Sequence, residues 1–258
     1  MKQDPMQTIL NHPLAVDQAC LWFLGQAGFI IRGGRTSVVI DPYLSDSVGK
    51  TAPAFSRAKP VPLDPSTMKV DVFIITHDHL DHLDPETIKA YPHAATTQFI
   101  APRLACRHLR ELGLPPQNIH RVDSGESLEL ADVRITGVYA VPTEPGAIDT
   151  TGYLLQFANG RSVYHSSDTA YSDLLLAAAP HAEVLLTVIN GNWGNLTPQQ
   201  AVTLAQHVRP RAAIPMHYDV MALNSQNPQT FAYFAHEAMP DLDVPILPYL
   251  KPFCWSAE

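Results

Sequence analysis

One short run of the sequence concentrates side chains that could bind a metal ion. It reads HDHLDH at positions 77–82 and follows an apolar segment that is typical of a strand. Imidazole nitrogens and carboxylate oxygens are common ligands of zinc, and also of manganese and iron. If the backbone stays extended beyond the strand, side chains alternate between faces, so His77, His79 and Asp81 point to one side. The spacing predicts a metal site at this strand end.

Two further candidate ligands follow apolar runs elsewhere in the chain, namely Asp168 and His217. Taken alone, Asp168 could equally cap the helix expected after it, and His217 could be an ordinary residue at a strand end. Combined with the HDHLDH run, Asp168 could bridge two metal ions. Asp81, His82 and His217 would then complete the second site.

The elements that must position these ligands alternate along the chain. Apolar runs predict strands at residues 21–31, 37–40, 70–75, 97–100, 133–140, 153–157, 162–164, 184–188, 212–215 and 244–247. Helices are expected at residues 104–112 and 171–179, and after the cap-and-proline pairs Asp84-Pro85, Thr197-Pro198 and Asn227-Pro228. Two sheets packed face to face with helices outside would satisfy this order, although the order alone leaves other α/β arrangements open. No repeat or linker divides the chain, so we expect one domain over residues 1–258.

Composition and charge restrict the class of protein. The chain has 258 residues, of which 46% are hydrophobic, so it can bury a large core. Its net charge of −8 disfavours a nucleic-acid partner. The first residues lack the apolar run of a signal peptide, and no apolar segment is long enough to span a membrane. Three scattered cysteines, Cys20, Cys106 and Cys254, are expected to be free thiols, so we expect a soluble protein of the reducing cytoplasm.

Together these motifs resemble the metallo-β-lactamase superfamily, and within it the L-ascorbate-6-phosphate lactonase family. The likeness extends over nearly the whole chain. It rests on the HDHLDH run and on the segments at 21–25, 38–41, 63–65, 99–102, 164–168, 214–219 and 251–255. The resemblance implies an α/β fold, the αββα sandwich, in which two mixed β-sheets carry helices on their outer faces. It also implies one or two divalent ions, Mn²⁺ or Zn²⁺, and members of the family often form homo-oligomers.

The same resemblance implies a metal-dependent hydrolase. We expect a metal-activated water to attack the carbonyl of a lactone or ester in a small anionic substrate, similar to a sugar acid or a sugar phosphate. The expected metal ligands are His77, His79, Asp81, His82, Asp168 and His217. Asp81 is also the candidate base that takes the proton of that water.

Other residues are expected to support this centre. Asp41, at a strand end, would orient a ligand histidine. His165 and Tyr218 would stabilise the oxyanion, with packing in the core as the alternative role for both. Many superfamily members carry another ligand histidine after a strand like that at 133–140, but this chain has none there. Glu144 or Asp149 could take its place as a ligand, and either could equally be a turn-forming acid.

The loop before the Thr197-capped helix is the candidate substrate-binding segment. Asn190, Asn192 and Trp193 would line the pocket, with the helix N-terminus favouring an anionic group. The alternative is a connecting loop without a role in binding. A phosphate would need cations, and the available ones are Lys50, Arg57, Lys59, Arg103 and Lys251.

Three other functions stay open at this point. A phosphodiesterase or nuclease on the same fold would keep the ligands but would need a basic track. A flavodiiron oxidoreductase would carry a carboxylate in place of His79 and a fused flavodoxin domain, and both are missing. A non-catalytic protein could retain the metal site on a decayed scaffold.

Overall fold

The computed structural model describes residues 4–144 and 147–257, and the strands within them form two mixed sheets. The first sheet has the order β13 (Pro252–Ser256), β1 (Gln18–Gly25), β2 (Gly28–Gly33), β3 (Thr36–Ile40), β4 (Val72–Ile74), β5 (Gln98–Ala101) and β6 (Ile119–Arg121). The second has the order β12 (Ala212–Met216), β11 (Val184–Val188), β10 (Ser162–His165), β9 (Thr151–Phe157), β8 (Val133–Tyr139) and β7 (Ser127–Leu130). Strands β3 to β6 run parallel, as do β10 to β12.

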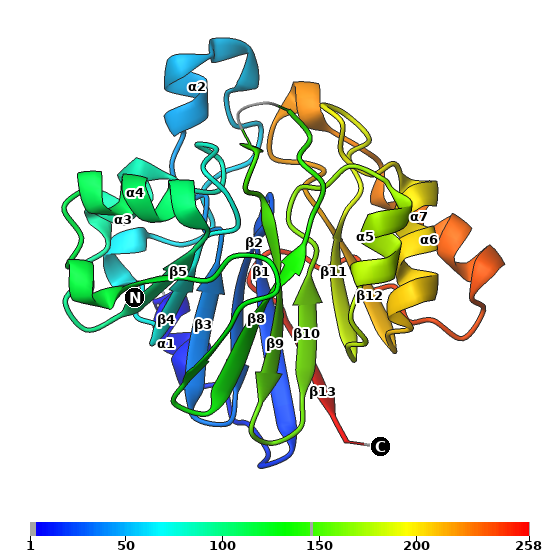
Figure 1. Ribbon diagram of the computed structural model, residues 1–258, viewed down its shortest axis with the longest axis horizontal. Coiled ribbons are helices and arrows are strands. Elements are labelled where there is room, and N and C mark those ends of the chain that lie inside the picture. Colours follow the sequence, from blue (N-terminus) through cyan, green and yellow to red (C-terminus); the bar gives the residue numbers. More distant parts are fainter. Residues whose placement is uncertain (1–3, 145–146, 258) are drawn as a thin grey trace.

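Helices cover the outer faces of both sheets (Figure 1). The α-helices are α1 (Pro5–Leu10), α2 (Ser47–Thr51), α3 (Pro85–Ala90), α4 (Arg103–Glu111), α5 (Asp173–Ala178), α6 (Pro198–Val208) and α7 (Pro228–Ala238). Short 3-10 turns are η1 (Pro53–Phe55), η2 (Pro65–Thr67), η3 (Pro116–Asn118) and η5 (Ala222–Asn224). Helices α3 and α4 lie beside the first sheet, and α5 to α7 lie beside the second. The predicted αββα sandwich is thereby confirmed.

The alternation of side chains along β1 shows how the layers hold together. Leu21 and Phe23 belong to the core cluster between the sheets, whereas Trp22 and Leu24 belong to the cluster under α1, α3 and α4. Successive residues of a strand point to opposite faces, so a strand buried on both faces reads as an unbroken apolar run. This explains why the first strand can be recognised in the sequence as an apolar run, although apolar and polar residues do not alternate along it.

The three predicted helix starts are confirmed. Asp84 accepts a hydrogen bond from the backbone of Glu86, and Asn227 accepts one from Gln229. Thr197 forms a capping box at the start of α6. Each cap satisfies a backbone N–H that has no partner within its helix.

Two of the strand predictions are wrong in detail. The run at 21–31 is not one strand but the hairpin of β1 and β2, because Gly25 takes a φ of 90° that ends the first strand. The run at 244–247 forms no strand, and only Asp243 makes an isolated bridge there. Pro245 and Pro248 lack the N–H groups that a ladder needs.

The expectation of three free thiols is also wrong. Cys20 of β1 and Cys254 of β13 form a disulfide, and Cys106 stays free and buried. The two cysteines lie 234 residues apart in the sequence but face each other directly in the antiparallel register of the two strands. The cysteines therefore do not indicate a reducing compartment.

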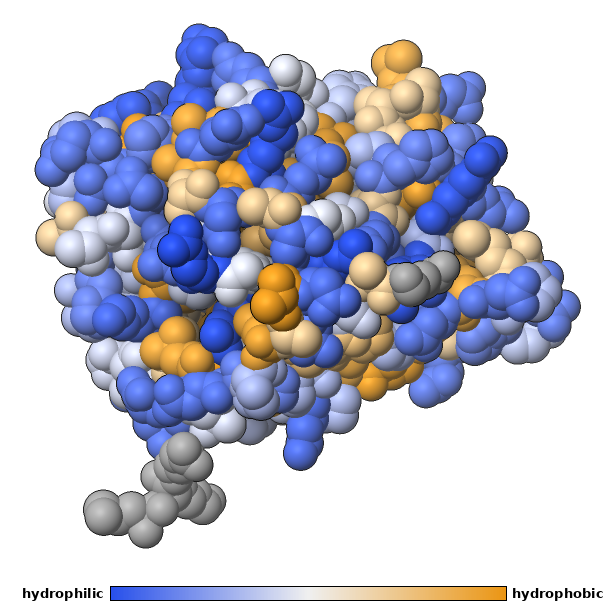
Figure 2. All heavy atoms as spheres, turned by 90° about the horizontal axis from the view of Figure 1, so that it is seen from below, coloured by the Kyte–Doolittle hydropathy of each residue, from blue (hydrophilic) through white to orange (hydrophobic). Residues whose placement is uncertain are grey.

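The surface gives further context. Seen from the end where β10 begins, the molecule is mostly hydrophilic, with apolar residues scattered among polar ones (Figure 2). Among the helices of residues 4–144 and 147–257, none has the length and apolar character needed to cross a membrane.

Candidate metal centre

The candidate ligands gather at the carboxyl ends of the parallel strands, at the upper edge in Figure 1. His77 follows β4, Asp168 follows β10 and His217 follows β12. Asp41 follows β3 in the same way. Parallel strands place their carboxyl ends at one edge of a sheet, and ligands of α/β proteins usually bind at that edge.

The backbone of the HDHLDH segment turns instead of staying extended, contrary to the prediction. Residues 77–83 form bends and turns. The backbone carbonyl of His79 accepts hydrogen bonds from the N–H groups of His82 and Leu83, at 3.0 and 2.7 Å. This compact turn brings His82 into the cluster, where an extended chain would have carried it away.

Two triads of potential ligand atoms lie close together. His77, His82 and Asp168 form one, with ligand atoms within 4.8 Å of one another. Asp81, His82 and His217 form the other, under the same limit. Nε2 of His217 lies 3.3 Å from carboxylate oxygens of both Asp81 and Asp168. His79 joins at the edge, with its Nδ1 at 2.9 Å from Nε2 of His77.

Two buried atoms at the middle of this cluster have no hydrogen-bond partner, and they indicate whether a cation fits there. Nε2 of His82 and Oδ1 of Asp168 are buried, and neither has a hydrogen-bond partner. They lie 3.6 Å apart, beyond the usual hydrogen-bond length. Buried polar atoms without partners are costly, and a divalent cation between them would satisfy both. Nitrogen and carboxylate donors suit zinc or manganese, so the residues present fit such an ion.

The charges around the cluster also favour a bound cation. Burial alone would lower the pKa of His82, but the carboxylates of Asp81 and Asp168 raise it well above its ordinary value. Burial would likewise raise the pKa of Asp168, yet His217 and His82 hold it well below the usual range. The buried carboxylates thus create a negative field that must be balanced by protons or by a cation.

Asp41 fixes the orientation of His82. Its Oδ1 accepts the backbone N–H of Thr76 at 2.8 Å, and its Oδ2 lies 2.7 Å from Nδ1 of His82. With Nδ1 directed at Asp41, the ring directs Nε2 at Asp81 and Asp168. The structure thus gives Asp41 the position that orienting a ligand histidine requires.

The structure places the two expected oxyanion residues away from the pocket. His165 is fully buried, its Nε2 donates to the carbonyl of Ala27, and its Nδ1 accepts from the N–H of Ser167. Tyr218 is buried against Phe23, with ring centroids 6.0 Å apart. Neither side chain is among the described residues that line the pocket.

The two acids considered for the third segment lie in different surroundings. Oε1 of Glu144 is 2.8 Å from Nε2 of His79, and Glu144 lines the pocket. Asp149 instead accepts a hydrogen bond from the backbone N–H of Leu104 in the first turn of α4. Only Glu144 is brought to the cluster.

A pocket of about 300 Å³ opens above the cluster. It is lined by Val48, Ala52, Phe55, His79, Asp81, Thr143, Glu144, Asp168, Trp193, Asn195, His217, Met221 and Asn224. Of the three substrate residues expected from the sequence, Trp193 is among them. Asn192 is not, and Asn190 is buried, where its Nδ2 donates to Oδ1 of Asn224 at 2.6 Å.

Three amides at the site were not expected from the sequence. Nε2 of Gln26 lies 2.7 Å from Oδ2 of Asp81. It also lies 3.1 Å from Nε2 of His217. Asn195 donates to Asp168 at 2.9 Å, and Asn224 lies 3.3 Å from Nδ1 of His217.

Backbone strain marks the same region. In the described part of the chain, eight non-glycine residues have a positive φ, and five of them lie at the site or in its loops. They are Gln26, Asp41, Ser167, Trp193 and His217. Such conformations are uncommon outside glycine and tend to cluster at functional sites. No pattern of residue types announces them in the sequence.

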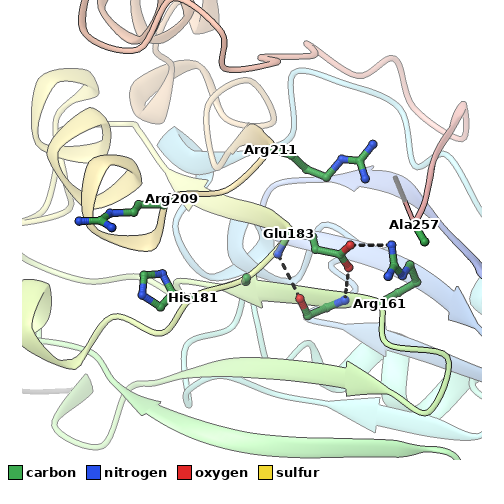
Figure 3. A pocket seen from close by; sticks show the side chains of 8 residues that line it. Arg161, His181, Glu183, Arg209, Arg211 and Ala257 are labelled. Atoms are coloured by element: carbon green, nitrogen blue, oxygen red, sulfur yellow. Dashed lines mark hydrogen bonds and ion pairs between the residues drawn. The ribbon is translucent and has the colours of Figure 1, made fainter.

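A larger hollow, of about 480 Å³, lies at the amino ends of β10, β11 and β12, on the opposite edge of the sheet. Arg161, His181, Glu183, Arg209, Arg211 and Ala257 surround it, as Figure 3 shows. Glu183 lies at its centre, where Oε1 pairs with Nη1 of Arg161 at 2.6 Å and Oε2 accepts the N–H of Ser162. Neither candidate triad at the carboxyl edge includes a residue of this hollow.

Comparisons with known proteins agree with the fold. The β-lactamase superfamily domain matches residues 36–218. A UPF0173 metal-dependent hydrolase of Pyrobaculum islandicum is 30% identical over 219 residues, which cover 81% of this chain and 88% of that protein. Another, from Koribacter versatilis, is 26% identical over 238 residues, covering 84% of this chain and 94% of the relative.

Solved structures with the same fold are more distant in sequence. A metallo hydrolase of Ignicoccus hospitalis superposes with a TM-score of 0.76 at 19% identity, covering 93% of this chain and 100% of that one. An isothiocyanate hydrolase from Delia radicum gut bacteria gives 0.75 at 15% identity, covering 92% and 100%. The chain therefore belongs to the β-lactamase superfamily and, within it, to the UPF0173 metal-dependent hydrolase family.

Proposed function

We propose that this metal-dependent hydrolase opens a lactone or cleaves an ester at the cluster of His77, Asp81, His82, Asp168 and His217. The observation that carries the proposal is the pair of buried, unpartnered atoms, Nε2 of His82 and Oδ1 of Asp168, at the centre of this cluster. A pocket of about 300 Å³ leads to them from the surface. The pair supports a bound cation, and the pocket supports a small organic substrate.

A divalent cation held by these histidine and aspartate side chains would supply a Lewis acid for a water molecule and for a carbonyl group. The protein's own groups then have distinct tasks. Asp41 orients His82, and Asn195 orients Asp168. Glu144 lies close enough to His79 to act as a further carboxylate ligand or to orient that imidazole.

Asp81 is the residue that we assign to the attacking water. Its contacts with Gln26, His82 and His217 all use Oδ2. Because Asp81 also lines the pocket, Oδ1 is the oxygen that we expect to accept the hydrogen bond of the water. Its pKa is held below the ordinary value: burial would raise the pKa, but His82 and His217 lower it more. Asp81 thus stays ionised at neutral pH, which suits a group that orients water.

A phosphodiesterase or nuclease gains no support from the pocket. The described residues that line it include neither lysine nor arginine. Phosphoryl transfer usually relies on such cations beside the metal ions. We therefore keep the carbonyl substrate as the proposal and use phosphodiesters as a control.

The test is a substrate panel on the full chain loaded with Zn²⁺ or with Mn²⁺. It contains simple esters, lactones, cyclic nucleotides and RNA. We expect turnover of esters or lactones that disappears with a chelator and returns with the metal. Turnover of the phosphodiesters alone would overturn the proposal, as would full ester hydrolysis by chelated protein.

A further inference from the structure

We propose that the pocket above the metal centre selects an uncharged substrate whose apolar or aromatic group lies against Phe55 and Trp193. The inference rests on the proposed function, because it names the substrate class of the same site. It replaces the anionic substrate that the sequence led us to expect.

An apolar wall forms one side of the pocket. Its members are Val48, Ala52, Phe55, Trp193 and Met221. Val48 and Phe55 pack against a small buried cluster of Tyr43, Val220 and Met221. The wall is therefore held in place by its own packing before any ligand arrives, which reduces the entropy that binding must overcome.

Two aromatic side chains stand at this wall. The rings of Phe55 and Trp193 have centroids 5.6 Å apart and planes inclined by 58°. Trp193 is 58% exposed, in a loop whose backbone takes a φ of 55° at this residue. A bulky residue rarely adopts that conformation, and an exposed tryptophan beside a pocket is a common feature of ligand-binding surfaces. An aromatic or alkyl group of the substrate would cover this exposed ring surface.

Charge points in the same direction, because the nearby cations are not among the described residues that line the pocket. Lys50 pairs with Glu86 at 2.7 Å. The guanidinium of Arg57 lies 4.9 Å from the ring centroid of Tyr43 and donates to the Tyr43 carbonyl at 2.8 Å. Neither lines the pocket, whereas the carboxylate of Glu144 does. A phosphate or carboxylate distant from the metal would find neither lysine nor arginine among the described lining residues, and burying its charge without such a partner would be costly.

The experiment compares three lactones on the metal-loaded full chain. They are dihydrocoumarin, which is aromatic and uncharged, γ-butyrolactone, which is small and uncharged, and 6-phosphogluconolactone, which is anionic. We expect kcat/KM to decrease in that order. W193A should lower kcat/KM for dihydrocoumarin about tenfold, mainly through KM, and change that for γ-butyrolactone less than about twofold.

Matched variants separate binding from disturbance of the loop. W193F keeps an aromatic ring and should restore most of the dihydrocoumarin activity, whereas F55A should resemble W193A. Y233A removes another exposed aromatic side chain, on α7 and outside the pocket, and should change nothing. The inference is overturned if 6-phosphogluconolactone is the best substrate, or if W193A lowers the activity on all three lactones equally.

A binding measurement separates this inference from the proposed function. Acetophenone and phenyl phosphate serve as inert aromatic probes, neutral and anionic, and their binding is followed by line broadening in NMR spectra. If no lactone is hydrolysed but acetophenone binds more tightly than phenyl phosphate and loses affinity in W193A, the proposed function fails and the preference for an uncharged group stands. If phenyl phosphate binds more tightly, or if neither probe is affected by W193A, the preference fails whatever the lactones show.

Discussion

The two hollows at opposite ends of β10, β11 and β12 differ in a way that size does not reveal. The hollow at the amino ends is larger, about 480 Å³ against about 300 Å³. At its centre Glu183 meets Arg161 in an ion pair that satisfies the acid. Nε and Nη1 of Arg161 also lack a hydrogen-bond partner there, but a guanidinium nitrogen has no lone pair to offer a metal ion. At the carboxyl ends, the buried atoms without partners are Nε2 of His82 and Oδ1 of Asp168, 3.6 Å apart, and both can bind a cation.

This difference separates a structural arrangement from a reactive one. Opposite charges that pair directly need no further ligand. Buried nitrogen and oxygen atoms that converge without a hydrogen bond retain a free-energy cost, which a bound cation can remove. The strained backbone around Gln26, Asp41 and His217 has the same implication, because strain persists only where the surrounding structure enforces it.

The largest expected effect comes from removing an unpartnered donor. In H82A or D168A, the cluster loses an atom that belongs to its centre. We expect metal content to fall well below that of the wild type, and ester or lactone turnover to decrease at least about a thousandfold, since the cation supplies several kcal/mol of transition-state stabilisation. Plasma emission spectrometry and initial rates measure the two. If both variants keep the metal content and the activity of the wild type, the cluster at the carboxyl ends is not the site of a catalytic metal ion.

A smaller loss is expected from Asp41, which contacts His82 but does not line the pocket. D41N keeps the shape and weakens the acceptor for the Nδ1 proton of His82. Loss of such a supporting group typically costs about 10- to 100-fold in metal affinity or activity. Chelator competition gives the affinity, and excess metal should restore part of the activity. If D41N binds the metal ion as tightly as the wild type, Asp41 does not contribute to metal binding through His82.

The HDHLDH run and the helix caps could be recognised in the sequence because the interacting residues are close together in the chain. A cap such as Thr197 acts within one turn of its helix, and His77 to His82 lie on one short segment. Even in this segment, the backbone turn at His79 could not be predicted, since the same residues are compatible with an extended chain and with a turn.

The remaining features depend on contacts between distant segments. Gln26 reaches His217 across 191 residues of sequence, and Cys20 reaches Cys254 across 234. The register of β1 with β13 decides the cysteine contact, and the packing of the two sheets decides the glutamine contact. Single side-chain types encode neither. For the same reason His165 read as a candidate catalytic residue, although the backbone of Ala27 and Ser167 occupies both of its ring nitrogens.

The affinity of the cluster at the carboxyl ends for a metal ion should depend on pH. Burial would lower the pKa of His82 and of His217, but the carboxylates of Asp168 and Asp81 raise both above the ordinary value. The metal-free fold therefore holds protons that a cation must displace, so binding releases protons and weakens as pH falls. Between about pH 8 and pH 6, we expect affinity to decrease by roughly tenfold per pH unit for each proton displaced.

Calorimetry in buffers of different ionisation enthalpy measures this proton release directly. We expect one to two protons per ion near neutral pH. D41N is the matched variant, because Asp41 contributes to the raised pKa of His82. Its proton release should be smaller than that of the wild type. Binding without proton release at pH 6 and pH 8 would show that neither histidine carries a displaceable proton.

The smallest effect on activity is expected at the amino-end hollow. R161M keeps the apolar stem of Arg161 and removes its pair with Glu183. Both side chains are largely buried, 11% and 24% exposed, so we expect the free energy of unfolding to fall by about 2 kcal/mol and Tm by roughly 5 °C. Metal content and kcat/KM should stay within about twofold of the wild type, because no atom of this pair belongs to the cluster at the carboxyl ends.

Calorimetry measures the change in Tm, with R209A as the control. Arg209 is an exposed arginine of the same hollow, and its replacement should leave Tm nearly unchanged, so the comparison isolates the contribution of the ion pair. A loss of metal or turnover in R161M with little change in Tm would mean that the two ends of the sheet are coupled and that the contrast between them is incomplete.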